Sequence, residues 1–289
     1  MWLDMLGCSV RHYDAGGVST RVIEAGAGEP VVLLHGLSGH AESWARNIVP
    51  LAERFRVVAV DMIGHGLTDK PDRSYLLPTF VEHLGAVLRA VSVGEAHLVG
   101  QSLGGWVAAW LALEQPEAVR TLTLVTTAGL KVSLATDGVQ QLQSQVRAVT
   151  RKALDALTRD AVRARLEWLM HRPQTVTDEL VELRYRIFLR DDSRRTMSRM
   201  VDDVTGDANL EYALTEDRLR QLEIPTLVLW SRHNPTTPWE EGEAAAAVIP
   251  KGRFVLLEDC AHWPQFEEPE RFNDVVLAFL SEHQTVTFD

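Results

Sequence analysis

The chain has 289 residues, which suits one large domain with an insertion as well as two small domains. With 46% hydrophobic and 24% charged residues, its composition is that of an ordinary soluble globular protein. The formal net charge of -11 repels phosphate backbones and anionic membrane surfaces, and no basic patch interrupts it, so neither nucleic acid nor a membrane is an expected partner.

At the N-terminus, Asp4 and the lack of a basic segment before an apolar run argue against a secretory signal. No stretch of the sequence approaches the roughly 20 apolar residues that cross a bilayer. The two cysteines, Cys8 and Cys260, lie far apart without metal-ligand spacing, so neither a disulfide framework nor a metal site is expected. We therefore expect a cytoplasmic enzyme or binding protein, and a homo-oligomer is compatible with this composition.

Short runs rich in Val and Leu alternate along the chain with longer segments of helical period. This alternation is typical of strand and helix repeats that form a largely parallel sheet. Strands are predicted at 31–35, 55–60, 96–100, 121–126, 226–230 and 253–258. Helices are predicted near 41–53, 78–92, 103–115, 239–249 and 268–282.

One stretch departs from this alternation. From Lys131 to Arg218 the sequence has no strand candidate but several helical patterns. We interpret 131–218 as an all-helical insertion between two parts of a core domain, 1–130 and 219–289. Its length, and its position after the sixth strand of the sheet, predict a lid over the ends of the strands, where open α/β sheets bind ligands.

Residues 100–104 read Gly-Gln-Ser-Leu-Gly, at a point where a predicted strand ends and a helix begins. A serine on such a sharp turn needs small neighbours two residues away on each side, because a larger residue would collide with the chain. The serine hydroxyl then stands exposed, and the N-terminus of the following helix stabilises negative charge. The spacing therefore predicts that Ser102 is a catalytic nucleophile.

A matching base is predicted at His262, after the last predicted strand and before the final helix. Among the 10 histidines, it is the one that lies between the last predicted strand and the final predicted helix, as the chain order of serine, acid and histidine requires. Its role would be to accept the serine proton and later to pass it to the leaving group. His35, in the His-Gly loop after an earlier strand, is expected to be structural.

These motifs, together with the segment 61–71, resemble those of the α/β-hydrolase superfamily over nearly the whole chain. The resemblance implies a mostly parallel eight-stranded sheet flanked by helices, and no metal or organic cofactor. In lipase and esterase relatives, the loop after the His-Gly strand contributes a backbone N–H to the oxyanion hole. This implies Leu37 and Leu103 as the two donors.

Within the superfamily, the chain looks most like the meta-cleavage product hydrolases, which split a carbon–carbon bond in ring-fission products carrying a 2-hydroxy-6-oxo-dienoate. The similarity lies in 170–186 and in the segment that begins with His262 and Trp263. Trp263 is either a core residue or a pocket wall, and together with Gln101 it is assigned to substrate binding.

In that family an arginine of the lid binds the substrate carboxylate, and Arg184 occupies the matching position. The alternative is a salt bridge from Arg184 to Glu179 or Glu182 on a solvated helix face. The sequence alone leaves both interpretations open, because a guanidinium suits either a planar carboxylate ligand or a surface ion pair.

The chain departs from its relatives within 226–238, where they carry the aspartate that orients the histidine and this chain has Asn234. Another place for the acid, after the sixth strand, holds Thr126 and Thr127, and the counterpart of Asp259 is not the triad acid in relatives. An asparagine can accept a hydrogen bond from the imidazole, but it cannot offset the positive charge that forms there. The corresponding change costs serine proteases about 10⁴ in turnover.

The predicted catalytic group is therefore Ser102, His262 and Asn234, which indicates a slow or specialised enzyme, an engineered trap, or a fold kept for another purpose. Our first hypothesis is a serine-dependent hydrolase of a small apolar substrate that bears a carboxylate, cleaving a carbon–carbon bond next to a ketone. An esterase or lactonase is the nearest alternative. A second alternative is a non-hydrolytic protein that binds ligands or acts like a cyclase. Haloalkane dehalogenases and epoxide hydrolases share the fold but use an aspartate nucleophile, so Ser102 argues against both.

Overall fold

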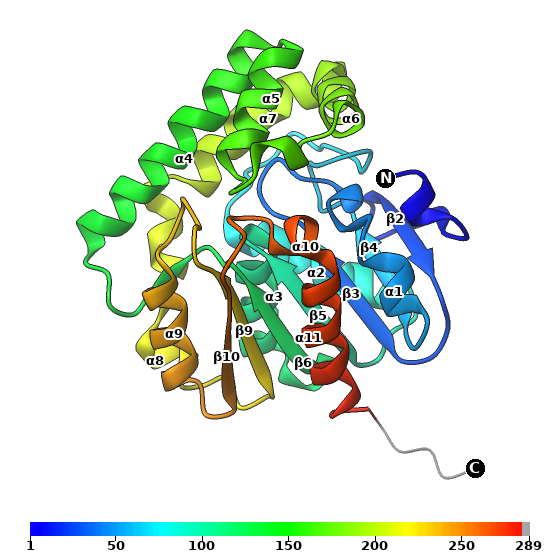
Figure 1. The fold of residues 1–289 in the computed structure, drawn as a ribbon, viewed down its shortest axis with the longest axis vertical. Coiled ribbons are helices and arrows are strands. Elements are labelled where there is room, and N and C mark those ends of the chain that lie inside the picture. Colours follow the sequence, from blue (N-terminus) through cyan, green and yellow to red (C-terminus); the bar gives the residue numbers. More distant parts are fainter. Residues whose placement is uncertain (285–289) are drawn as a thin grey trace.

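The computed structural model describes residues 1–284 and is built around an eight-stranded sheet with helices on both faces (Figure 1). The strands lie in the order β1-β2-β4-β3-β5-β6-β9-β10. Only the pairings of β1 with β2 and of β2 with β4 are antiparallel. The predicted fold class is therefore confirmed. The bounds are β1 Ser9–Asp14, β2 Ser19–Ala25, β3 Pro30–Leu34, β4 Arg56–Val60, β5 Ala96–Gln101, β6 Val119–Val125, β9 Thr226–Ser231 and β10 Gly252–Leu257.

The central strands are buried on both faces, which explains their near-continuous runs of apolar residues. In β3, for example, Val32 and Leu34 pack into the larger core on one face of the sheet. Val31 and Leu33 pack into the smaller core on the other face. Helices α2 (Leu77–Ala90), α3 (Leu103–Glu114) and α9 (Trp239–Val248) cover the larger core, and α1 (Ile48–Ala52) and α11 (Pro269–Ser281) cover the smaller one.

A group of helices lies between β6 and β9 in the sequence; α4 to α7 stand above the sheet in Figure 1, whereas α8 lies lower, beside α9. Hydroxyl caps start two of them, because Thr158 Oγ1 accepts from Ala161 N and Thr177 Oγ1 accepts from Leu180 N. A short parallel pair of strands, β7 (Leu130–Lys131) and β8 (Leu214–Thr215), joins the two ends of this group. The helices are α4 Thr136–Ala156, α5 Arg159–Trp168, α6 Asp178–Leu189, α7 Asp191–Val204 and α8 Glu216–Leu219, with short 3-10 turns at Pro173–Thr175 and Asp207–Tyr212.

Two features near the N-terminus differ from the prediction. The hairpin of β1 and β2 was not predicted, because the side chains of the edge strand β1 are mostly exposed and follow no apolar alternation. The helix predicted at 41–53 is split into a 3-10 turn at Ala41–Trp44 and helix α1. Pro50 explains the break, since its ring clashes with the carbonyl four residues before it and stops an α-helix from extending further toward the N-terminus.

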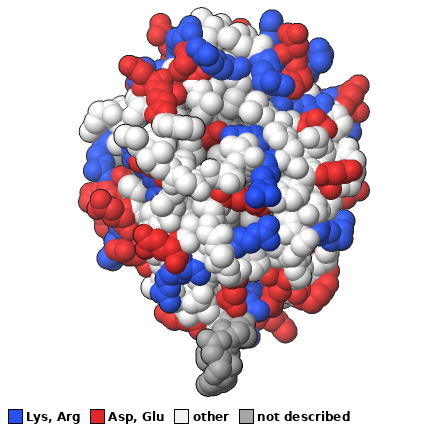
Figure 2. All heavy atoms as spheres, turned by 90° about the vertical axis from the view of Figure 1, so that its right-hand side faces the viewer, with Lys and Arg blue, Asp and Glu red and all other residues white. Residues whose placement is uncertain are grey.

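Charges of both signs are mixed on the face of the molecule that Figure 2 presents. Blue and red side chains alternate around a broad area without charge, and no patch of one sign dominates that face. Among residues 1–284, no helix combines the length and the apolar character that a membrane span needs.

Two buried histidines are held as neutral rings, because each accepts a hydrogen bond from a backbone N–H. His35 Nε2 accepts from Met62 N at 3.1 Å, and His83 Nδ1 accepts from Ile63 N at 3.3 Å. Their other nitrogens bind Gly36 O and Thr20 Oγ1. Burial lowers the pKa of His35 to about 3 and that of His83 to about 4. Both rings therefore bind protons more readily in the unfolded chain than in the fold.

We expect acid to destabilise the protein well before its carboxylates titrate. The free energy of unfolding should fall by about 1.4 kcal/mol per pH unit for each such histidine once the pH drops below about 6.5. Urea unfolding between about pH 7 and pH 5 measures this slope. In His83→Gln the dependence of the unfolding free energy on pH should be smaller by the contribution of one histidine. An unchanged slope would contradict the conclusion that His83 is held as a neutral ring.

Candidate active site

Ser102 sits between β5 and α3, and its backbone has the strained values φ 55° and ψ -117°. Its N–H donates to Val125 O at 2.9 Å, and its carbonyl accepts from Gly105 N and Trp106 N. A Cβ at Gly100 would overlap with the carbonyl of Gly104, and a Cβ at Gly104 would overlap with the carbonyl of Leu34. The two glycines therefore permit the sharp turn that carries the serine.

His262 lies after β10, and the side chain of Asn234 fixes its ring. Its Nδ1 is 2.8 Å from Asn234 Oδ1. The amide of Asn234 cannot turn over freely, because its Nδ2 donates to Thr237 O at 2.8 Å and its Oδ1 accepts from Thr236 N and Oγ1. An acceptor fixed at this place requires the proton on Nδ1, and it leaves Nε2 free to accept from a serine hydroxyl.

Thr236 is a contact of the histidine that the sequence did not indicate. Its Oγ1 lies 3.2 Å from His262 Nδ1 and 3.1 Å from Asn234 Oδ1, so the hydroxyl bridges the two side chains. It lies in the same loop as Asn234, directly after Pro235. A threonine in a loop carries no sequence signal for such a role.

No carboxylate contacts the imidazole within residues 1–284. Thr126 Oγ1 and Gln101 Nε2 each donate to His262 O at 3.0 Å, so both hold the backbone of the histidine. Asp259 is exposed. The buried carboxylate of Glu267 accepts from the backbone N–H of Ala261 and from two further N–H groups, of His171 and Arg172, and so braces the loop from behind.

The environment of His262 strongly favours the neutral ring. The residue is 6% exposed, and burial, followed by the positive charge of Arg165, lowers its pKa to about 3. A neutral imidazole is the form that a general base needs before reaction. The same environment opposes the imidazolium that must form when the base accepts a proton.

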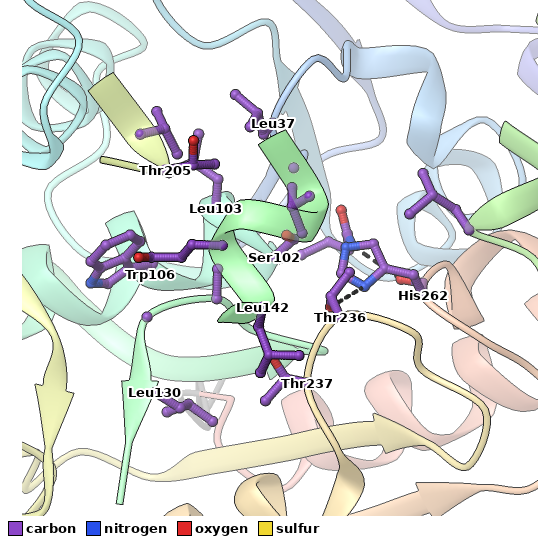
Figure 3. A pocket seen from close by; sticks show the side chains of 18 of the residues that line it. Leu37, Ser102, Leu103, Trp106, Leu130, Leu142, Thr205, Thr236, Thr237 and His262 are labelled. Carbon is purple, nitrogen blue, oxygen red and sulfur yellow. Dashed lines mark hydrogen bonds between the residues drawn. The ribbon is translucent and has the colours of Figure 1, made fainter. Parts of the chain in front are cut away.

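One pocket collects most of the predicted site residues (Figure 3). It lies where residues that follow β3 and β5 face side chains of α4 and α5. Leu103 begins α3, where the first N–H groups have no partner within the helix. In residues 1–284 no hydrogen bond joins Ser102 to His262, and such catalytic bonds often tighten only when substrate binds. The predicted residues that line the pocket are Leu37, Gln101, Ser102, Leu103, His262 and Trp263.

Arg184 is buried rather than on a solvated helix face, so the surface ion pair considered from the sequence is wrong. It is 1% exposed, while Glu179 pairs with the N-terminal amine and Glu182 pairs with Arg159 and Arg186. Its guanidinium carbon lies 5.1 Å from the ring centre of Trp263, but Arg184 is not among the residues that line the pocket. Burial, and then the charge of Arg165, lower its pKa to about 9.

Arg165, on α5, is a second buried arginine and lines the pocket directly. No sequence motif distinguishes it, because it stands among other charged residues of an amphipathic helix. Its neighbour Arg163 looks equivalent in sequence but pairs with Asp178 and Glu167. Only tertiary structure distinguishes the two arginines.

Comparisons with known proteins bear on the fold and the family of the chain. The family described as alpha/beta hydrolase fold matches residues 29–269. The 2-hydroxy-6-oxo-6-(2'-aminophenyl)hexa-2,4-dienoic acid hydrolase of Metapseudomonas resinovorans is 30% identical, covering 96% of this chain and 92% of that protein. The 2-hydroxymuconate semialdehyde hydrolase of Pseudomonas sp. (strain CF600) is 32% identical over 94% of both chains. The meta-cleavage product hydrolase of Pseudomonas fluorescens IP01, solved with acetates, has a TM-score of 0.80 at 26% identity and covers 96% of this chain and 100% of its own.

Proposed function

Since this chain belongs to the α/β-hydrolase fold family and, within it, to the meta-cleavage product hydrolases, we propose that it is a serine-dependent hydrolase. Its substrate is small and largely apolar and carries a carboxylate, and the bond that it cleaves is a carbon–carbon bond next to a ketone. The observation that carries the proposal is that Ser102 and His262 line one pocket beneath the helices that follow β6. A serine hydroxyl that shares a pocket with a neutral, oriented imidazole is the combination of groups that acyl transfer uses.

In the proposed reaction, Ser102 Oγ attacks the ketone carbon while its proton passes to His262 Nε2. The developing oxyanion is stabilised by the backbone N–H groups of Leu37 and Leu103. The carbon–carbon bond then breaks, and its electron pair goes to the leaving carbon, which takes the proton back from His262. Water, deprotonated by His262, attacks the acyl-serine and releases a carboxylic acid and the free hydroxyl of Ser102.

Arg184 provides the test that separates carbon–carbon cleavage of a dienoate from simple esterase activity. Arg184→Gln should lower kcat/KM for 2-hydroxy-6-oxo-dienoates by about 10- to 150-fold, the value of a charge-assisted hydrogen bond. Neutral 4-nitrophenyl esters should be barely affected. Steady-state kinetics on both substrates measures the difference, and an equal loss on both would remove Arg184 from carboxylate recognition.

Two other functions lead to different results in the same assays. An esterase or lactonase would hydrolyse aryl esters or lactones and leave ring-fission dienoates intact. A non-hydrolytic ligand-binding or cyclase-like protein is favoured by one observation, the neutral amide of Asn234 at His262 Nδ1. A fluorophosphonate reagent separates this case, because it labels Ser102 only if the hydroxyl is activated.

A further inference from the structure

The buried guanidinium of Arg165 lines the pocket and has few partners among residues 1–284. The residue is 6% exposed and lines the same pocket as Ser102 and His262. Its Nε donates to Thr150 Oγ1 at 3.1 Å, and its guanidinium carbon lies 5.0 Å from the ring centre of Trp168. These contacts hold the group in place. Its Nη1 is buried and has no hydrogen-bond partner within residues 1–284.

The charge of Arg165 also lacks a counterion among the described residues. No acidic side chain forms a salt bridge with it, in contrast to Arg163 two residues before it. Burial lowers the pKa of Arg165 to about 10, so the group is still protonated near neutral pH. An unpaired buried charge is costly, and the cost is recovered when an anion binds. The flat fork of a guanidinium fits the two oxygens of a carboxylate.

We propose that Arg165 binds an acid group of the substrate inside the pocket, and that this acid group offsets the positive charge that opposes protonation of His262. The inference rests on the proposed function in taking the bound anion to be part of a substrate. It assigns an anion contact to a residue of α5 that lines the pocket, whereas Arg184 on α6 lies outside the lining.

The second part of the proposal follows from the charges around His262. The neutral Asn234 and Thr236 contact its Nδ1, Glu267 is engaged by backbone N–H groups, and the positive charge of Arg165 opposes protonation of the ring. A carboxylate paired with Arg165 cancels this repulsion just when the imidazole must accept the serine proton. An acidic substrate is therefore both bound more tightly and turned over faster than a neutral one.

A pair of esters with one leaving group tests the proposal without any dienoate. The two are 4-nitrophenyl hydrogen succinate, which carries a carboxylate, and its neutral methyl ester. In Arg165→Met we expect kcat/KM for the acid to fall by about 10- to 150-fold, through both a higher KM and a lower kcat. Hydrolysis of the neutral ester should stay the same or rise. Equal changes on both esters would overturn the proposal.

Arg163→Met is the matched control, because Arg163 lies on the same helix but forms salt bridges at the surface. It should change neither ester. Arg165→Lys keeps the charge and should keep most of the preference for the acid. Methionine in place of an unpaired buried arginine should leave the melting temperature unchanged or higher.

Binding measured without turnover separates this inference from the proposed function. In the Ser102→Ala background, calorimetry should show that benzoate binds more tightly than benzamide, and Arg165→Met should remove most of the difference, with Arg184 accounting for any remainder. No preference for benzoate would overturn the Arg165 site, even if the wild-type protein cleaves dienoates. A clear preference in a protein that leaves dienoates intact would reject the proposed reaction and keep the site.

Discussion

Replacing Ser102 with alanine is expected to lower turnover by up to about 10⁶-fold, the loss found when the nucleophile of a serine protease is removed. The substitution deletes the attacking oxygen and little else. Ligand binding should survive, because the pocket keeps its apolar wall and its buried arginine. Single-turnover and steady-state assays on a chromogenic ester measure the loss, and calorimetry with benzoate measures binding.

The control for this prediction is His262→Ala, alone and combined with Ser102→Ala. Nucleophile and base act as a unit, so the double variant should be no slower than the slower single variant. Hydrolysis that continues at the wild-type rate in Ser102→Ala would reject the serine as nucleophile. Losses that multiply in the double variant would mean that His262 acts on something other than Ser102.

Asn234→Asp is expected to raise turnover by about 10² to 10⁴, the upper figure being the cost of the reverse change in a serine protease. The contact to His262 Nδ1 already exists at 2.8 Å, so the variant adds a charge at the imidazole with almost no change in side-chain size. It also loses the hydrogen bond from Asn234 Nδ2 to Thr237 O, so the Thr237 carbonyl must shift away from the new carboxylate oxygen. A carboxylate at this distance stabilises the imidazolium and raises the pKa of His262 from its depressed value. The rate and an NMR titration of the histidine should therefore move together.

Asn234→Ala serves as the control, because it removes the acceptor that fixes the ring and adds no charge. It should reduce activity below that of the wild type, because among residues 1–284 it leaves Thr236 as the one side-chain contact at His262 Nδ1. If Asn234→Asp changes neither the rate nor the titration of His262, another acid already offsets the imidazolium, and the interpretation of an acid-deficient site is wrong.

The parts of the fold that the sequence predicted are those in which local pattern and tertiary burial agree. Strand β5 and helix α3 are an example, because the apolar run, the glycines and the serine all act over a few neighbouring residues. Strand β1 was missed because its exposed edge imposes no alternation on its side chains. The proline that splits the helix predicted at 41–53 was visible in the sequence, but its effect depends on where the preceding carbonyl lies.

The candidate site divides in a similar way. The positions of Ser102 and His262 could be predicted because strand ends and chain order identify them. The burial of Arg184 and Arg165 could not, since each lies on a charged helix whose inner face is set by packing against other elements. Thr236 could not be predicted, because its role depends on the orientation of the side chains of Asn234 and His262.

The loop that places Asn234 against His262 also affects the deamidation of this residue during storage. An asparagine side chain usually converts to aspartate when the backbone nitrogen of the next residue attacks its amide and forms a cyclic imide. Here the next residue is Pro235, which has no N–H, so that ring cannot close by the usual route. Stored protein will therefore not acquire the aspartate form by this route. Substrate hydrolysis measured with this chain can therefore be attributed to the protein with an intact Asn234. The Asn234→Asp variant can then be compared with a stable reference.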